Sequence, residues 1–272
     1  MPRTAHKPFS CHNTYLGLIP VLAQRNLKEE AEVAIEDYLR AHRMDKVLAG
    51  LVEEKDDVPT ALPFIEEPER SEEEDIGSAR LPPAFRTSLR KVARYNLGVA
   101  YDFGGEIDPE RDILSPLWTD VARGIVFKES SVILGGVLRA ADLQDTFDSS
   151  NLRDRIIRSA VTIGEKTSWP DTVVISARYP SLVDARNDIL DFGSFSIGER
   201  GMIGRIGGIP TYLSNALDEL DVLVYDKSYV MLIRQSLKID MDDVAHPSRL
   251  KIDCLCVSNT IRGSIAAHLR RT

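Results

Sequence analysis

An acidic, proline-rich segment from Asp56 to Phe85 is the strongest constraint on how this 272-residue chain can fold. It contains five prolines, and its part from Glu66 to Asp75 carries seven acidic side chains and one arginine. A basic run with apolar residues at strand spacing follows at once, beginning at Arg86. Composition alone fits a disordered acidic linker. The abrupt change of charge favours instead a hairpin arm that meets the opposite charge on another chain.

Dense like charge is repelled within a compact monomer and relieved by opposite charge across an interface. The residues expected to make contacts between subunits are therefore the charged ones of this arm: Glu66, Glu67, Glu72, Glu73, Glu74, Arg86, Arg90, Lys91 and Arg94.

Helical periodicity predicts two helices around the arm. Residues 26–55 have an asparagine N-cap candidate, acidic residues in the first turn and apolar residues at helical spacing, which predicts a helix interrupted near Gly50. A longer helix is predicted from Asp108, a possible N-cap followed by proline, to a turn at Gly135 and Gly136.

Shorter elements follow along the chain. A third helix is predicted to start at Ser149 or Ser150, and after it short apolar strands dominate. A buried strand at residues 172–179 leads into a helix with Pro180 at its first position. The fold class is therefore α+β.

The glycine-rich stretch from Ile203 to Leu217 could be a phosphate-binding loop or a structural bend. It lacks the G-x-G-x-x-G and G-x-x-x-x-G-K-[ST] spacings, and an extended run rather than a helix follows it. Gly-Gly followed by proline is a turn signal. We therefore expect structural turns, and no bound cofactor, at Gly207, Gly208, Pro210 and Asn215.

Composition limits the functions that are possible. The formal net charge of −8 argues against a surface that holds nucleic acid by clustered cations. No stretch approaches 18 uninterrupted apolar residues, so we expect a soluble, cytosolically made protein without membrane contact. Cys254 and Cys256 share a face of a predicted strand and, without further ligands at zinc spacing, are expected to be buried rather than metal-bound.

No catalytic signature is present in the sequence. H-E-x-x-H, G-x-S-x-G and C-x-x-C are absent, and the five histidines are scattered along the chain. The prediction is a protein without catalytic residues, metal or cofactor.

Four stretches, in this order along the chain, carry a resemblance to a known family. "WTDVARGIVFKESSVILGG", in which Glu129 precedes an apolar step and glycines, resembles the end of the spine helix of the Hong Kong 97 shell fold. "TVVISARYPSLVDARND", "GRIGGIPTYLSNAL" and "VLVYDKSYV" resemble the strands and turns that follow in that fold. The family comprises the major capsid proteins of tailed phages and the encapsulins.

The resemblance implies a domain organisation. It comprises an N-terminal arm at 1–25, a helical segment at 26–55, an extended loop (E-loop) at 56–105, a peripheral domain with the spine helix at 106–178 and 235–272, and an axial domain at 179–234. In this family the extended loop lies over a neighbouring subunit, which gives the charged arm a purpose.

The resemblance also implies a function. The first interpretation is a major capsid protein that assembles through pentamers and hexamers into an icosahedral shell around double-stranded DNA, held without sequence recognition. Scaffolding, portal and decoration proteins are possible partners, and the location is the virion, assembled in the host cytoplasm. The second is an encapsulin shell around a cargo enzyme, and the third is an α+β enzyme of another class.

Overall fold

The computed structural model describes residues 27–66, 86–102, 114–148, 150–178, 201–218, 220–242, 249–262 and 265–271. The chain divides into two compact units. One contains nearly all of α2 (Leu27–His42), the start of α4 (Leu114–Ala140) and the strands β5 (Val99–Asp102), β12 (Lys238–Asp242) and β13 (Arg249–Asp253). The other contains the remaining described elements. No described helix is long and apolar enough to cross a membrane.

The first unit combines a helix and a small antiparallel sheet. In α2, apolar residues recur every four positions at Ala31, Ile35 and Leu39. All three are buried, so the helix buries one apolar face. The sheet has the order β12-β13-β5, and all of its pairings are antiparallel.

The helix predicted over 26–55, with an interruption near Gly50, is already interrupted after His42 and does not continue past Leu48. A short helix, α3 (Asp45–Leu48), follows α2, and Leu51–Glu54 form the strand β1. β1 pairs in parallel with β11 (Val230–Arg234), a partner far away in the sequence that periodicity cannot reveal.

A mixed six-stranded sheet dominates the second unit. Its order is β6-β15-β10-β7-β9-β8. The sheet combines strands from the segments 106–178 and 235–272, which we expected in the peripheral domain, with strands from 179–234, which we expected in the axial domain. The strands are β6 (Leu143–Phe147), β7 (Thr172–Ser176), β8 (Met202–Ile206), β9 (Ile209–Ser214), β10 (Asp221–Tyr225) and β15 (Ala266–Arg271).

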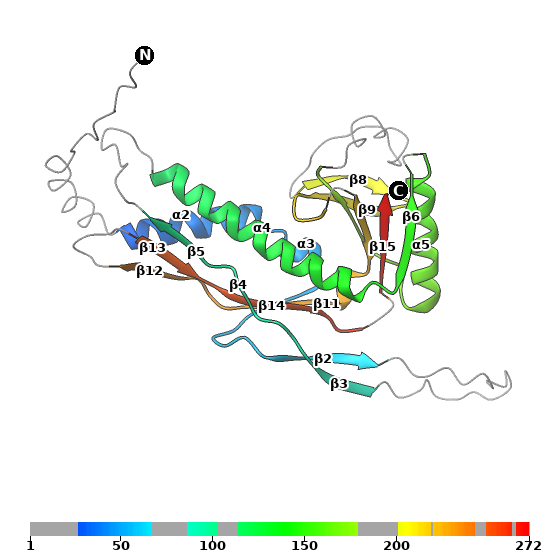
Figure 1. The fold of residues 1–272 in the computed structure, drawn as a ribbon, viewed down its shortest axis with the longest axis horizontal. Coiled ribbons are helices and arrows are strands. Elements are labelled where there is room, and N and C mark those ends of the chain that lie inside the picture. Colours follow the sequence, from blue (N-terminus) through cyan, green and yellow to red (C-terminus); the bar gives the residue numbers. More distant parts are fainter. Residues whose placement is uncertain are drawn as a thin grey trace, which may run out of the picture. The chain divides into compact units, whose positions relative to one another are not determined.

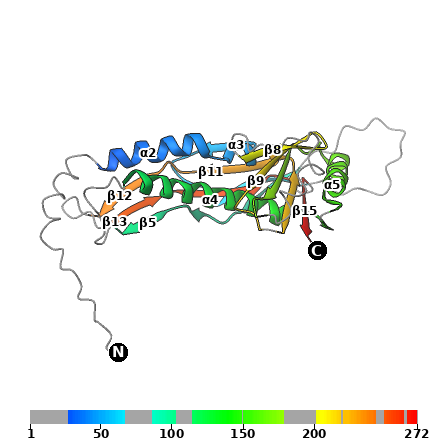
Figure 2. The same ribbon diagram turned by 90° about the horizontal axis from the view of Figure 1, so that it is seen from above.

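Helix α5 (Leu152–Lys166) covers one face of this sheet (Figure 2). Its buried stripe repeats at helical spacing through Leu152, Ile156, Ala160 and Ile163. Alternate residues of the sheet's strands pack against this stripe, because successive side chains of a strand point to opposite faces. The core formed in this way includes Val173, Ile175, Val222, Val224, Ala267 and Leu269.

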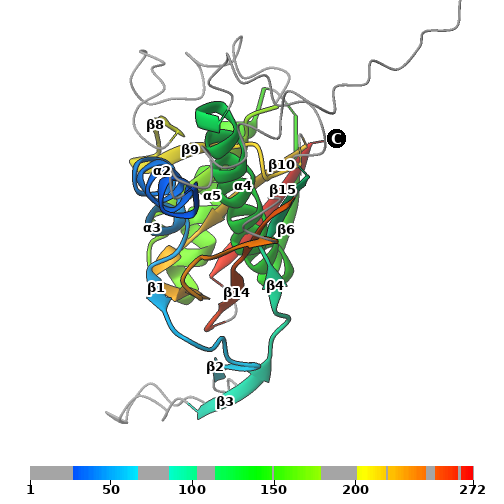
Figure 3. The same cartoon turned by 90° about the vertical axis from the view of Figure 1, so that its left-hand side faces the viewer.

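A second, four-stranded sheet has the order β1-β11-β14-β4, with β14 at Leu255–Thr260 and β4 at Tyr95–Asn96. Figure 3 shows β1 and β4 at its two edges. The two-stranded hairpin β2 (Ala61–Glu66) and β3 (Arg86–Lys91) is antiparallel and in continuous register (Figure 1).

The predicted turn at Gly135 and Gly136 is wrong, because α4 continues through both residues to Ala140. The adjacent Ile133, Leu134 and Val137 are fully or almost fully buried. Their burial outweighs the helix penalty of a glycine, which is about 1 kcal/mol.

The glycine pair between β8 and β9 forms a two-residue turn. Gly207 and Gly208 have φ values of 58° and 80°, the left-handed conformation that such a hairpin turn requires. Asn215 lies in the turn after β9, whereas Pro210 lies inside β9, contrary to the expected turn. The pairing of β9 with β7 starts only at Thr211, so the missing N–H of Pro210 leaves no ladder bond unmade on that side.

Candidate assembly surface

The β2–β3 hairpin has an inner face that packs on its own subunit. Leu62 and Phe64 of β2 are 2% and 7% exposed. Leu62 joins a cluster with Val58, Ile233 and Val257, which belong to the loop before β2 and to the strands β11 and β14. The hairpin is therefore held on the second unit at its base, which a two-stranded ribbon requires for stability.

The outer face of the same hairpin carries the alternate residues. In the observed register Pro63 lies opposite Leu89 and Ala61 lies opposite Lys91. Pro63 and Lys91 are exposed, and Leu89 is 76% exposed. This outer face thus presents an apolar centre beside a cation.

Most of the predicted contact residues of the acidic part cannot be placed. Glu66 is exposed at the end of β2, opposite Arg86 in the strand register. Arg90 and Lys91 are exposed on β3. Glu67, Glu72, Glu73 and Glu74 lie outside the described residues. Whether any of these residues contacts a neighbour stays a prediction.

Two of the basic residues make contacts within the chain. The guanidinium of Arg90 lies 3.1 Å from the ring centroid of Phe64, a cation–π contact. Nη2 of Arg94 lies 3.8 Å from Oδ1 of Asp57, and both side chains are exposed. Exposed pairs of this kind contribute about 0.2–1 kcal/mol, so Arg94 is available for other partners.

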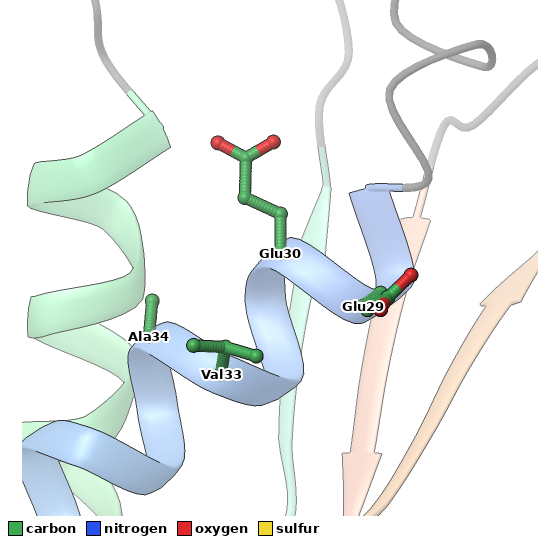
Figure 4. A pocket seen from close by; sticks show the side chains of 4 residues that line it. All are labelled: Glu29, Glu30, Val33 and Ala34. Carbon is green, nitrogen blue, oxygen red and sulfur yellow. The ribbon is translucent and has the colours of Figure 1, made fainter.

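A surface hollow lies on the first half of α2 (Figure 4). It is lined by Glu29, Glu30, Val33 and Ala34, which recur on one helix face. Both carboxylates are exposed, and Val33 is 57% exposed. The hollow therefore combines an apolar floor with negative charge.

A cluster of five charged side chains, of which Arg234, Asp45 and Glu129 are buried, connects four segments of the second unit. Arg234 of β11 donates from Nη1 to Asp45 Oδ2 at 2.6 Å and to Glu129 Oε1 at 3.0 Å. Its Nε donates to Oε1 of Glu54, its register partner in β1, at 2.9 Å. Arg43 Nε donates to Glu129 Oε2 at 3.1 Å. The cluster ties α4 to α3, β1 and β11.

Burial and the two arginines compete in setting the pKa values of these carboxyl groups. Desolvation raises the pKa of Glu129, which is 2% exposed, and the charges of Arg43 and Arg234 only partly offset it. For Asp45, burial also acts to raise the pKa, but the hydrogen bond and charge of Arg234 outweigh it, and the pKa is lowered. Burial acts to lower the pKa of Arg234, but the charges and hydrogen bonds of the carboxylates outweigh it and raise the pKa, so Arg234 stays charged.

Sequence reasoning pointed to Glu129 only through the resemblance, and it missed the arginine partners. Arg234 ends the apolar run VMLIR, and a charged residue in such a run was the one available signal of a buried partner. Its partners are as many as 189 residues away in sequence, so no local pattern could have identified them.

The described residues contain no group of three or more His, Cys, Asp or Glu side chains that could hold a metal ion. Cys254 and Cys256 are buried and free, with Sγ of Cys254 donating to the carbonyl of Gln235 at 3.2 Å. Burial raises their pKa values to about 11 and about 12.

Comparison with known proteins identifies the fold. No model of a known protein family matches the sequence, and no curated protein matches it. Among solved structures, the capsid of the native GTA particle matches with a TM-score of 0.60 and 12% identity over 86% of this chain and 98% of that chain. The virus-like particle from Pyrococcus furiosus matches with a TM-score of 0.57 and 10% identity over 89% and 98%. The capsid of cyanophage P-SCSP1u matches with a TM-score of 0.55 and 12% identity over 83% and 86%. The chain therefore has the Hong Kong 97-type fold of capsid and particle shell proteins.

Proposed function

We propose that copies of this chain assemble through pentamers and hexamers into a closed shell, and that the shell is a viral capsid around double-stranded DNA. The observation that carries this proposal is the match of 83–89% of the chain to capsid and particle structures. The hairpin supports it, because its outer face exposes the apolar side chain of Leu89, which is 76% exposed, beside Lys91.

A shell around cargo protein is the second candidate. The virus-like particle from Pyrococcus furiosus has a TM-score of 0.57, between the scores of the two capsids, 0.55 and 0.60. We favour the capsid because the run "GGIP…SNAL…VYDKSYV" and the C-terminal "CVSNTIRGSIAAHLRR" resemble phage proteins more. The negative charge of −8 fits a shell whose lining does not trap a packaged genome. We assign no catalytic activity to the chain.

Purification of native particles separates the two candidates. The capsid proposal expects shells, seen by electron microscopy and sedimentation, that contain nuclease-protected double-stranded DNA. Shells that contain one folded enzyme and no DNA would support the compartment instead. A monomer of 30.3 kDa as the sole species at all tested salt and pH values would contradict both.

The basic strand offers a second test. Reversal of Arg90 and Arg94 to glutamate should leave the circular dichroism of the subunit unchanged but lower the shell yield or make it more sensitive to salt. Lys91→Glu is a necessary companion variant, because Arg90 also contacts Phe64 within the subunit. Assembly equal to that of the parent at low and high salt would show that the electrostatic account is wrong.

A further inference from the structure

We propose that the outer face of the β2–β3 hairpin docks on the acidic hollow of α2 in a second copy of this chain. This inference rests on the proposed assembly into a shell and names two surfaces that meet in it. It concerns Leu89 and Lys91 on the hairpin and Glu30 and Val33 on the helix.

The hairpin side of the contact is an uncovered sheet face. Strand alternation places Thr87, Leu89 and Lys91 on the face opposite to the buried Leu62 and Phe64. Thr87, Leu89 and Lys91 are all exposed. Leu89, at 76%, is the most exposed of the large apolar side chains described.

The helix side of the contact has the matching character. Val33 is 57% exposed in the hollow, and Glu29 and Glu30 border it. Figure 4 shows these side chains on neighbouring turns of α2. An apolar residue within a charged rim is the usual pattern of a contact between proteins.

The negative charge of α2 indicates that a positively charged surface binds in the hollow. Between Leu27 and His42, α2 carries five carboxylates, one lysine and one arginine. The outer face of β3 carries one cation, Lys91, and no carboxylate, because strand alternation places Arg90 on the face of Phe64. Two copies of one chain thus present complementary surfaces, and each copy offers both, so the contact can repeat from subunit to subunit around a ring.

Cysteine crosslinking tests this contact directly. Two full-length chains that differ in an affinity tag, one with Leu89→Cys and one with Val33→Cys, are assembled together and oxidised mildly. We expect a disulfide-linked heterodimer, identified by peptide mass spectrometry as 33–89. The matched control pairs Leu89→Cys with Val161→Cys, a valine on α5 that is 42% exposed. Leu89, Val33 and Val161 are all exposed, so the subunits with these substitutions should fold.

Charge exchange gives an independent readout. Lys91→Glu should weaken each contact about two- to fivefold, the effect of one exposed ion pair, and lower the shell yield at low salt. Adding Glu30→Lys to the same chain should restore the yield. Adding Glu165→Lys, on the exposed face of α5, should not.

The possible outcomes are distinct. Shells that form normally with no more 33–89 heterodimer than the control, or with no rescue by Glu30→Lys, would overturn the docking site and leave the shell proposal intact. A disulfide from position 33 to Cys11 of the same chain would show that the hollow receives the preceding segment instead, and would equally overturn it. A parent chain that forms no assembly would overturn both proposals.

Discussion

Nη1 of Arg234 lies 3.0 Å from Oε1 of Glu129, and the two side chains are only 8% and 2% exposed. Removal of one partner of a buried ion pair leaves the other charged in a medium of low polarity. We expect Arg234→Leu to lower the free energy of unfolding by about 3–5 kcal/mol. The control is Arg40→Ala, whose exposed pair with Asp37 should contribute at most about 1 kcal/mol. Urea unfolding of dissociated subunits measures both, and equal effects would contradict the cluster.

The raised pKa of Glu129 makes a prediction with a definite sign. A carboxyl whose pKa is higher in the fold stabilises the fold when protonated, and this stabilisation is lost as the pH rises through that pKa. Glu129→Gln cannot ionise, so relative to the variant the parent should lose stability as the pH rises through that range. Asp45, whose pKa is lowered, is present in both the parent and the variant, so its own pH dependence is common to the two proteins that are compared.

Unfolding in urea from about pH 4 to about pH 8 measures this difference. A parent that gains stability relative to Glu129→Gln as the pH rises would show that Arg43 and Arg234 outweigh the burial of Glu129.

Gly50 is required by a close approach between two segments. A Cβ at this position would lie 2.6 Å from both the carbonyl oxygen of Lys227 and the Cα of Ser228. These are backbone atoms, and the Gly50 N–H also donates to that carbonyl at 2.7 Å. We expect Gly50→Ala to cost about 1–3 kcal/mol by overpacking, seen as a lower midpoint of thermal unfolding. An unchanged midpoint would mean that the segments separate freely.

Gly135 should respond in the opposite direction. It lies inside α4, and a Cβ there would meet nothing closer than the Arg139 side chain at 3.5 Å. Alanine is a better helix former, so Gly135→Ala should raise the free energy of unfolding by up to about 1 kcal/mol. A loss of stability in the same unfolding experiment would show that α4 does not accommodate a methyl group at this position.

The buried thiols should be unreactive in the folded protein. With pKa values of about 11 and about 12, Cys254 and Cys256 hold far less thiolate at about pH 8 than an ordinary cysteine does. We expect iodoacetamide to modify them at least about 100-fold more slowly in the native protein than in urea. Peptide mass spectrometry distinguishes them from Cys11, and rapid native labelling would contradict their burial.

Local patterns in the sequence predicted the elements that depend on local chemistry. The helix predicted to start at Ser149 or Ser150 is α5, Leu152–Lys166, and the glycine pair before Ile209 has the backbone that a hairpin turn requires. The buried strand TVVIS was likewise evident from its apolar run. These features need neighbours within a few residues only.

Features that depend on distant partners could not be predicted in the same way. Leu51–Glu54 was read as helix because its strand partner, Met231–Arg234, is distant in the sequence. The helix past Gly135 is stabilised by burial that a propensity scale does not contain. The ion cluster around Arg234 combines both problems, since its members come from α3, α4, β1 and the link between α2 and α3.

The position of β15 has a consequence for the folding of the nascent chain. This strand, Ala266–Arg271, lies between β6 and β10 in the six-stranded sheet, and it is the last described strand to be translated. A nascent chain therefore lacks an interior strand of the sheet until those residues leave the ribosome. The topology thus delays the mature subunit until synthesis has passed residue 271.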